Sequence, residues 1–170
     1  METITRNVEV KNEMLVLFFS GRSYLSNFYK CKFELDGNTF SSMEQYFHYS
    51  KAAIFKDKDS MKRILNTNDC REQKRLGRRV KQYKENIWAE KCYIVMKQGL
   101  YAKFDQNPIL KERLLSISNA RFVEASPYDR KWGIGIEADH PNAVQPSKWP
   151  GNNLLGKALT ETRDILKTLD

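Results

Sequence analysis

The sequence predicts a mainly α-helical protein with a small antiparallel β element near its N-terminus. After Ser41, apolar residues recur at intervals of three and four, as on one face of a helix, whereas short or alternating apolar runs dominate the first forty residues. Hydrophobic residues make up 41% of the chain and aromatic residues 12%, which is typical of globular proteins. No linker, internal repeat or low-complexity tract divides the chain, so we expect residues 1–170 to form a single domain.

Three short stretches predict the β element. Met14–Phe19 is an apolar run rich enough for a buried strand. Residues 31–35 alternate apolar and charged side chains, as in a half-buried strand. Asp36-Gly37-Asn38 then supplies turn chemistry before a short return strand at Thr39–Phe40.

Helices are expected at several places downstream. Ser41-x-x-Glu44 has the form of a capping box, which places the first helix start at Ser41 or Ser42. Asn107-Pro108 combines a polar cap with proline in the first turn. The expected apolar faces are, in chain order, Phe40, Met43, Phe47 and Ile54; Leu76, Val80, Tyr83 and Ile87, continuing or restarting through Trp88, Cys92, Met96 and Leu100; Leu110, Leu114 and Ile117; and Leu155, Leu159, Thr162, Leu166 and Leu169.

The segment before the last helix lacks a regular pattern. Arg121–Ala125 suits a short strand, and an irregular stretch follows from Ser126 to Gly151, with the last helix starting near Asn153. A loop of this length inside a compact domain is usually functional or disordered. Its apolar residues, Trp132, Ile134 and Trp149, argue against disorder.

The excess of positive charge is concentrated in one segment. The formal net charge is +8, of which +7 falls within residues 56–84, where eleven basic residues face four acidic ones. Such a segment fits a partner that bears phosphate, either a nucleotide or a nucleic acid. The alternative is a solvated helix face that keeps the protein soluble.

Metal, membrane and export signals are weak. The chain's cysteines and histidines are Cys31, Cys70, Cys92, His48 and His140. None of them forms a C-x-x-C pair, so we expect reduced thiols, no metal site and no cofactor. The Met14–Phe19 run is too short to span a bilayer, and Met1-Glu2-Thr3 lacks the basic start of a signal peptide. We therefore expect a cytoplasmic protein without a membrane partner.

Two segments carry groups that could perform chemistry. Glu44 and Lys51 are two helical turns apart and would share a face, as base and nucleophile or simply as residues flanking a core stripe. A capping-box role alone would also account for Glu44. Asp129 and Trp132 lie in a loop with two glycines, where sites are often built, although a turn cap with a packing anchor would look the same. The nearby Gly133-Ile134-Gly135 is not a dinucleotide fingerprint, because no helix starts directly after it.

Short motifs extend in order from Phe19 to about Arg163. They are Phe19-Ser20; Leu25-Ser26-Asn27-Phe28; Ser42-Met43-Glu44-Gln45-Tyr46-Phe47 with Lys51-Ala52; Lys74-Arg75-Leu76-Gly77-Arg78; Trp88; Lys103-Phe104; Glu124-Ala125-Ser126-Pro127-Tyr128-Asp129 with Trp132-Gly133-Ile134-Gly135; and Trp149-Pro150-Gly151-Asn152-Asn153-Leu154-Leu155-Gly156. In this order and spacing the chain resembles the NADAR, or YbiA-like, family. The resemblance implies a mainly helical, single-domain N-glycosidase.

The resemblance also implies two types of substrate. One is ADP-ribose attached to guanine bases, and the other is a pair of phosphoribosylamino-pyrimidine intermediates of riboflavin synthesis. Both hold a ribose carbon bonded to nitrogen, with phosphate nearby. Glu44, Trp88, Asp129 and Trp132 occupy the positions that the resemblance marks as functional, and Lys51 matches as well.

A mechanism follows as a hypothesis. Glycosidic cleavage commonly uses two carboxyl groups, so we expect Glu44 and Asp129 to converge, one acting on the sugar and one on the leaving group. Lys51 offers a second route, through a Schiff base at C1 of an opened ribose. We further expect a group of residues to bind the substrate: Arg22, Ser26, Asn27, Phe28, Phe47, Trp88, Trp132, Gly133 and Asn153. For the tryptophans core packing is the alternative, and for the asparagines the capping of turns or helices.

Three functions remain open from the sequence. The first is removal of ADP-ribose from guanine, in DNA, RNA or free nucleotide, and the basic segment favours it because a polymeric substrate rewards positive charge. The second is hydrolysis of the riboflavin intermediates. The third is a module that binds ADP-ribose or nucleic acid without turnover. The oligomeric state is left open.

Overall fold

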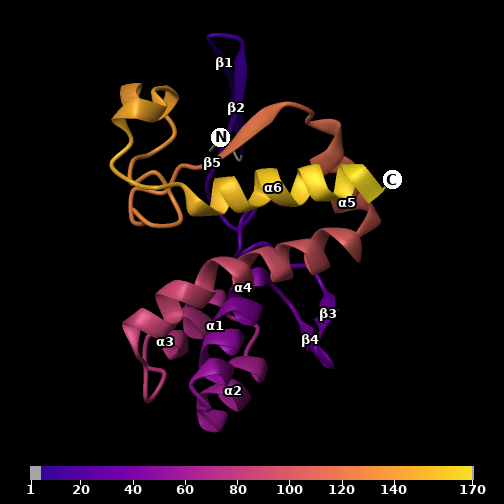
Figure 1. Ribbon diagram of the computed structural model, residues 1–170, viewed down its shortest axis with the longest axis vertical. Helices are drawn as coiled ribbons and strands as arrows, with labels where there is room; N and C mark the ends of the chain where they lie inside the picture. The colour runs from indigo at the N-terminus through magenta and orange to yellow at the C-terminus, as the bar shows by residue number, and fades with distance from the viewer. Residues whose placement is uncertain (1–4, 170) are drawn as a thin grey trace. The chain divides into compact units, whose positions relative to one another are not determined.

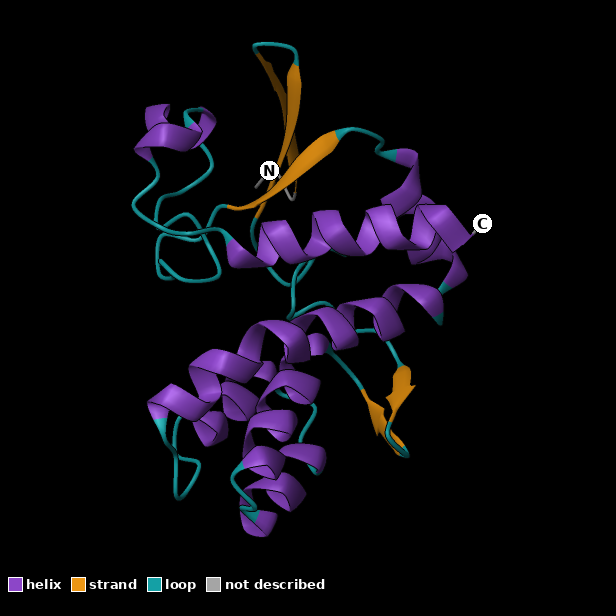
Figure 2. Ribbon diagram, viewed as in Figure 1, coloured by secondary structure: helices purple, strands orange, loops and turns teal. Residues whose placement is uncertain are grey.

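The computed structural model describes residues 5–169 and comprises two compact units (Figure 1). Unit 1 contains residues 5–26 and 109–169, and unit 2 contains Asn27–Pro108. Helices account for most of the regular structure and the strands are short (Figure 2), so the expected mainly α class with a small N-terminal β element is confirmed. Met1-Glu2-Thr3, from which the absence of a signal peptide was argued, lies outside the described residues.

Unit 1 is built on a three-stranded sheet in the order β1-β2-β5. β1 (Thr5–Val10) and β2 (Glu13–Phe18) form an antiparallel hairpin, and β5 (Ala120–Glu124) pairs with β2 in parallel. The hairpin turn, Lys11-Asn12, has positive φ at both residues, as a type I′ turn requires. β2 and β5 match the expected strands within about a residue, whereas β1 was not expected. The antiparallel element is therefore extended by a parallel strand from far along the chain.

The long segment after β5 is irregular but packed. It includes two short 3₁₀ turns, η1 (Pro141–Val144) and η2 (Pro146–Lys148). Ile134 and Ala143 are fully buried with side chains of β2 and β5, and the Trp149 indole donates to the carbonyl of Ala143 at 2.9 Å. Unit 1 also contains two helices, α5 (Pro108–Ser116) and α6 (Leu154–Leu169). The boundary between the units falls after Pro108, the first residue of α5, and α6 packs on β5. The loop and both helix starts agree with expectation.

Unit 2 consists of a hairpin and four helices. The hairpin pairs β3 (Phe33–Leu35) with β4 (Asn38–Phe40), as the Asp36-Gly37-Asn38 turn predicted. The other elements are α1 (Met43–Ile54), α2 (Lys58–Leu65), α3 (Cys70–Gly77) and α4 (Glu85–Asp105). α1 packs against the other three helices and so lies at the centre of the unit.

Two helix predictions in unit 2 were incomplete or wrong. α2 was not expected, because its eight residues carry only one fully buried apolar side chain, Ile64. The pattern from Leu76 to Ile87 is not one helix: α3 ends at Gly77, residues 78–84 form a loop, and α4 restarts at Glu85. Val80 lies in this loop and is buried, so an apolar residue stands at the helical spacing although no helix is present there.

No helix in the described residues is both long and apolar enough to cross a membrane.

Candidate functional site

The start of α1 is fixed by Ser42, not by Ser41. The Ser42 side chain accepts a hydrogen bond from the backbone N–H of Gln45 at 3.1 Å, which makes Ser42 the N-cap. The Gln45 side chain returns to the backbone N–H of Ser41 at 2.7 Å. Gln45, and not Glu44 as the sequence pattern predicted, thus provides the side chain that accepts a backbone hydrogen bond at the start of the helix. The capping-box explanation of Glu44 is wrong, and its carboxylate is available for another role.

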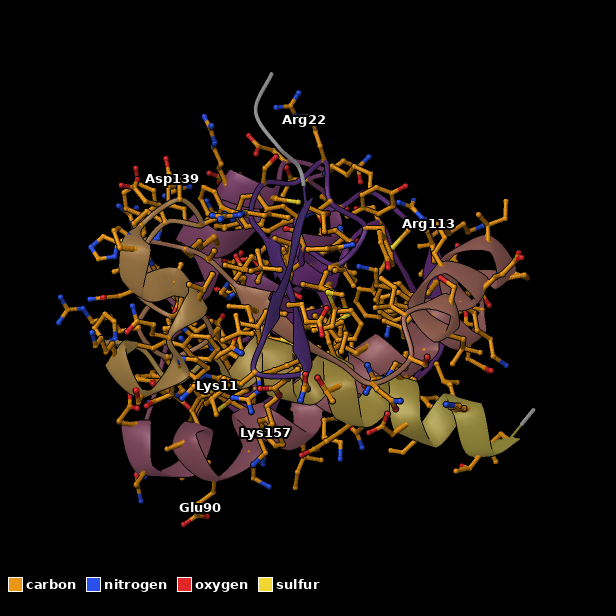
Figure 3. All side chains as sticks on the ribbon, turned by 90° about the horizontal axis from the view of Figure 1, so that it is seen from above. Lys11, Arg22, Glu90, Arg113, Asp139 and Lys157 are labelled. Carbon is orange, nitrogen blue, oxygen red and sulfur yellow. The ribbon has the colours of Figure 1, made fainter. Side chains whose placement is uncertain are left out.

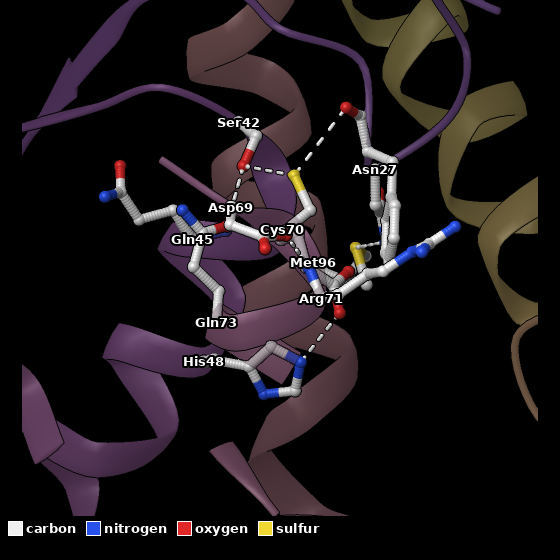
Figure 4. A network of polar contacts seen from close by, with 11 residues as sticks. Asn27, Ser42, Gln45, His48, Asp69, Cys70, Arg71, Gln73 and Met96 are labelled. Atoms are coloured by element: carbon white, nitrogen blue, oxygen red, sulfur yellow. Dashed lines mark hydrogen bonds and ion pairs between the residues drawn. The ribbon is translucent and has the colours of Figure 1, made fainter. Parts of the chain in front are cut away.

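Glu44 is buried beside His48, one turn further along α1. Oε1 of Glu44 lies 2.8 Å from Nε2 of His48, and Glu44 and His48 are 6% and 8% exposed (Figure 4 shows His48). Oε2 of Glu44 makes no hydrogen bond to any described residue. The backbone N–H of Glu44 donates to the carbonyl of Asn27 at 3.0 Å. Asn27 and Glu44 are seventeen positions apart, and their motifs therefore meet at the N-terminus of α1.

Asn27 and Phe28 border a network of polar contacts (Figure 4). The Asn27 amide nitrogen lies 3.7 Å from Sδ of Met96 on α4, and its Oδ1 is buried without a hydrogen-bond partner in the described part of the chain. The thiol of Cys70 contacts the Phe28 carbonyl and the Ser42 hydroxyl. An unpaired buried acceptor is uncommon, so Oδ1 of Asn27 is a candidate for a ligand or a water molecule.

Lys51 lies among aromatic rings two turns after Glu44. Its Nζ is 4.3 Å from the ring centroid of Tyr83 and 5.9 Å from that of Trp88. The Trp88 ring in turn packs on Phe47, with centroids 5.0 Å apart. Both centroids lie within the range over which a ring face attracts a cation. Three expected site residues, Phe47, Lys51 and Trp88, thus come together in unit 2.

Asp129 organises the loop of unit 1. Its Oδ1 accepts from the backbone N–H groups of Lys131 at 2.9 Å and Trp132 at 2.8 Å, an Asx-type turn. Oδ2 makes no hydrogen bond to any described residue. Gly133 is required here, because a Cβ at this position would lie 2.8 Å from the carbonyl oxygen of Asp129. The turn-cap explanation of Asp129 therefore holds for one oxygen and leaves the other available.

Asn153 has a structural role in unit 1. Its Oδ1 accepts from the N–H of Glu124 at 3.0 Å, and its Nδ2 donates to the carbonyl of Phe122 at 2.9 Å. Its own N–H donates to the carbonyl of Gly133. The expected substrate contact of Asn153 is untested, and its amide is already engaged by β5. Ser26 is buried, whereas Arg22 is exposed and extends outward (Figure 3).

The expected site residues thus fall in two groups, each described within its own unit. Unit 2 holds Asn27, Phe28, Glu44, Phe47, Lys51 and Trp88, and unit 1 holds Arg22, Ser26, Asp129, Trp132, Gly133 and Asn153. The meeting of Glu44 with Asp129 stays a prediction. His48 and Tyr83 were not among the expected site residues, although the spacing of His48 four residues after Glu44 was a usable signal.

Most carboxylates of the basic segment already have a partner. Asp57 caps α2 and also accepts from the N–H of Lys81, and Asp69 caps α3. Burial raises the pKa of Asp57, but the hydrogen bonds from Lys81 and Ser60 outweigh it and leave the pKa below its ordinary value. Glu72 pairs with Arg75, and this hydrogen bond lowers the pKa of the Glu72 carboxyl. Asp59 lies 3.9 Å from Arg63, so Arg63 and Arg75 each have an acidic neighbour, whereas Lys58, Lys62 and Arg71 are exposed.

The described residues contain no cluster of three or more side chains that could hold a metal ion. Cys31, Cys70 and Cys92 are free thiols.

Comparison with known proteins identifies the family to which the chain belongs. The NADAR domain family model matches residues 17–167, which run through both units. N-glycosidase R617 of Acanthamoeba polyphaga mimivirus is 41% identical over 133 residues, 76% of this chain and 78% of that protein. Riboflavin biosynthesis protein VVA0006 of Vibrio vulnificus is 29% identical over 144 residues, 85% of this chain but 35% of that protein.

The fold also matches a solved structure. The NMR structure of the Escherichia coli protein YbiA has a TM-score of 0.75 and 30% sequence identity, covering 91% of this chain and 86% of that one. That protein carries the name N-glycosidase YbiA. The names of R617 and YbiA support the expectation of a hydrolase that acts on N-glycosidic bonds.

Proposed function

Since the chain belongs to the NADAR domain family, we propose that it is an N-glycosidase that removes ADP-ribose from guanine, in nucleic acid or in free nucleotide. The observation that carries the proposal is the buried Glu44 carboxylate, which His48 holds through Oε1 and whose Oε2 has no hydrogen-bond partner among residues 5–169. We also propose that residues 1–170 act as one domain, in which Glu44 and Asp129 face the same sugar. The family match supports this, because it runs through both units.

The chemistry follows from the charges that develop during cleavage. Breaking a ribose C–N bond builds positive charge on the sugar carbon and negative charge on the departing base. One carboxylate stabilises the sugar cation or activates water, and the other assists the leaving group. Glu44 and Asp129 each have one oxygen that no described residue binds, which is available for such a task. Trp88 and Trp132 would stack on a base or sugar, at about 1–3 kcal/mol per stacked base.

Lys51 supports a covalent variant of this reaction. Its amine would attack C1 of an opened ribose, form a Schiff base and release guanine, and water would then hydrolyse the imine. Only a neutral amine is a nucleophile, so the Lys51 ammonium must lose a proton before it attacks. We expect Lys51→Arg to abolish turnover while largely retaining ligand binding, measured by product formation and by calorimetry. Normal turnover by the arginine variant would exclude the covalent route.

The riboflavin intermediates are the second candidate substrate. The observation that favours them is the similarity to VVA0006, whose name places it in riboflavin biosynthesis. They share with ADP-ribosyl guanine a ribose carbon bonded to nitrogen and a nearby phosphate. The charge of residues 56–84 favours the guanine substrate, because nucleic acid would use a basic surface that a small metabolite cannot cover.

One assay separates the candidates. The protein is incubated with ADP-ribosylated guanine DNA and, separately, with the phosphoribosylamino-pyrimidine, and the products are followed by mass spectrometry. We expect cleavage of the first substrate and a loss of at least about a hundredfold in Glu44→Gln and Asp129→Asn. Glu90→Gln, on the exposed side of α4, is the matched control and should retain full activity. Tight binding of ADP-ribose without any product would instead indicate a binding module.

A further inference from the structure

His48 contacts the Glu44 carboxylate, and the mechanism proposed above gives His48 no role. Its Nε2 lies 2.8 Å from Oε1 of Glu44, and the side chains of both residues are about nine-tenths buried. The two lie four positions apart on α1, so they share one face of the helix. The Glu44 carboxylate is therefore held by a side chain of the same helix, α1.

The other ring nitrogen identifies the tautomer. Nδ1 of His48 is buried and has no hydrogen-bond partner among the described residues. A proton on Nδ1 would leave a buried donor unpaired, and orphaned buried N–H groups are rarer than orphaned acceptors. The geometry therefore favours the tautomer that carries its proton on Nε2 and donates it to Glu44.

Gly77 provides the space that the ring occupies. A Cβ built on Gly77 would lie 1.9 Å from Nδ1 and 2.4 Å from Cγ of His48. Gly77 is the last residue of α3, and its φ is not in the left-handed region, so alanine would suit its backbone. The absence of a side chain at Gly77 is thus explained by the ring of His48 and not by backbone strain.

We propose that His48 is a positioning residue for Glu44: through Nε2–H it fixes Oε1 and leaves Oε2 as the oxygen that meets the substrate. The proposal rests on the proposed function for its consequence in catalysis, but the hydrogen bond itself does not depend on which substrate is cleaved. A positioned carboxylate acts without reorganising in the transition state. The loss of His48 should therefore affect kcat more than KM.

The tautomer can be tested without any substrate. In ¹⁵N-labelled protein, the ring nitrogen shifts separate a protonated from an unprotonated nitrogen. The chain has two histidines, so His140→Gln leaves His48 as the single histidine signal. We expect a protonated Nε2 and an unprotonated Nδ1 at neutral pH. A protonated Nδ1 at His48 would overturn the proposal.

Three variants at position 48 test the positioning role. The amide nitrogen of glutamine reaches close to the place of Nε2, whereas that of asparagine reaches only the place of Nδ1, and leucine offers no donor. We expect His48→Gln to keep kcat within about fivefold of the wild type, and His48→Asn and His48→Leu to lose about 10- to 100-fold, with KM changed less than about threefold. Gly77→Ala should lower kcat in the same way, because its methyl group displaces the ring.

The outcomes are distinguishable. If the wild type cleaves neither substrate, the proposed function fails, and the NMR result still decides the hydrogen bond. If the wild type is active, Glu44→Gln is inactive and His48→Asn keeps a normal kcat, the positioning role is wrong. Should His48→Leu fail to fold, the comparison of the polar Gln and Asn variants still decides, with circular dichroism to show that both are folded.

Discussion

Asn153 joins the start of α6 to β5 through both atoms of its side-chain amide. It completes the hydrogen bonds of Phe122 and Glu124 on the strand, is 5% exposed, and adopts φ of +52°. Among residues with a side chain, asparagine is one of those that adopt this left-handed backbone conformation most readily. Asn153 therefore supplies a left-handed backbone conformation, one buried hydrogen bond and one partly buried hydrogen bond.

We expect Asn153→Ala to lower the free energy of unfolding by about 2–4 kcal/mol, because it leaves the partly buried N–H of Glu124 and the buried carbonyl of Phe122 unpaired. Urea unfolding followed by circular dichroism measures the change. Asn152→Ala is the matched control, since Asn152 is exposed, and should change stability by less than about 0.5 kcal/mol. Equal stability of the two variants would contradict the structural role.

At the same scale, the sequence predicted residue identities better than residue environments. Glu44, Lys51 and Trp88 were selected, but nothing in the pattern showed that Gln45 and not Glu44 would complete the cap. Lys103 belongs to a recognised motif, yet its complete burial, which lowers its pKa to about 8, was not predictable. Burial depends on partners from other elements, which a local pattern does not contain.

At the scale of elements, α1 shows what periodicity can and cannot predict. Its start and its buried face followed from Ser42 and from the spacing of Met43 and Phe47. α2 was missed because an eight-residue helix with a single buried apolar residue has almost no periodic signal. β1 escaped for a similar reason: it is an edge strand with no fully buried residue. Elements held mainly by hydrogen bonds leave little trace in the hydrophobic pattern.

The cap of α1 can be tested directly. We expect Ser42→Ala to destabilise the protein by about 1–2 kcal/mol, because Ser42 satisfies the N–H of Gln45 and also bonds Gln73. Ser41→Ala keeps the backbone bond from Ser41 to Gln45 and should cost no more than about 0.5 kcal/mol. Thermal unfolding of both variants decides between them. A larger loss of stability in Ser41→Ala than in Ser42→Ala would indicate that Ser41, and not Ser42, is the N-cap of α1.

At the scale of the whole molecule, the charge distribution separates two kinds of substrate. Nearly all of the net charge of +8 comes from residues 56–84, all of which lie in unit 2. Asp57 and Asp69 are engaged in helix caps, whereas Glu72 pairs with Arg75 and Asp59 pairs with Arg63. The remaining basic residues of the segment give it its net charge of +7. Charge of this kind attracts a polyanion over several helical turns, and a small nucleotide would use only a part of it.

A salt titration tests this difference. For ADP-ribosylated single-stranded DNA, we expect the logarithm of the binding constant to fall steeply with the logarithm of salt concentration, because each neutralised phosphate releases counterions. A triple variant on α2 should reduce that slope by about 2, since about 0.7 is lost per removed phosphate contact. It carries glutamine at Lys58, Lys62 and Arg63, all of which are exposed.

The matched control neutralises three exposed lysines of unit 1, Lys148, Lys157 and Lys167, and should leave the slope unchanged. Turnover of a free ADP-ribosyl nucleotide should be the same in both triple variants, because neither changes a residue of the proposed site. If the two variants lowered the slope equally, the positive charge would act only as a diffuse field. If neither did, and activity were confined to the small nucleotide, the basic segment would be a solvated helix face and nucleic acid would not be the substrate.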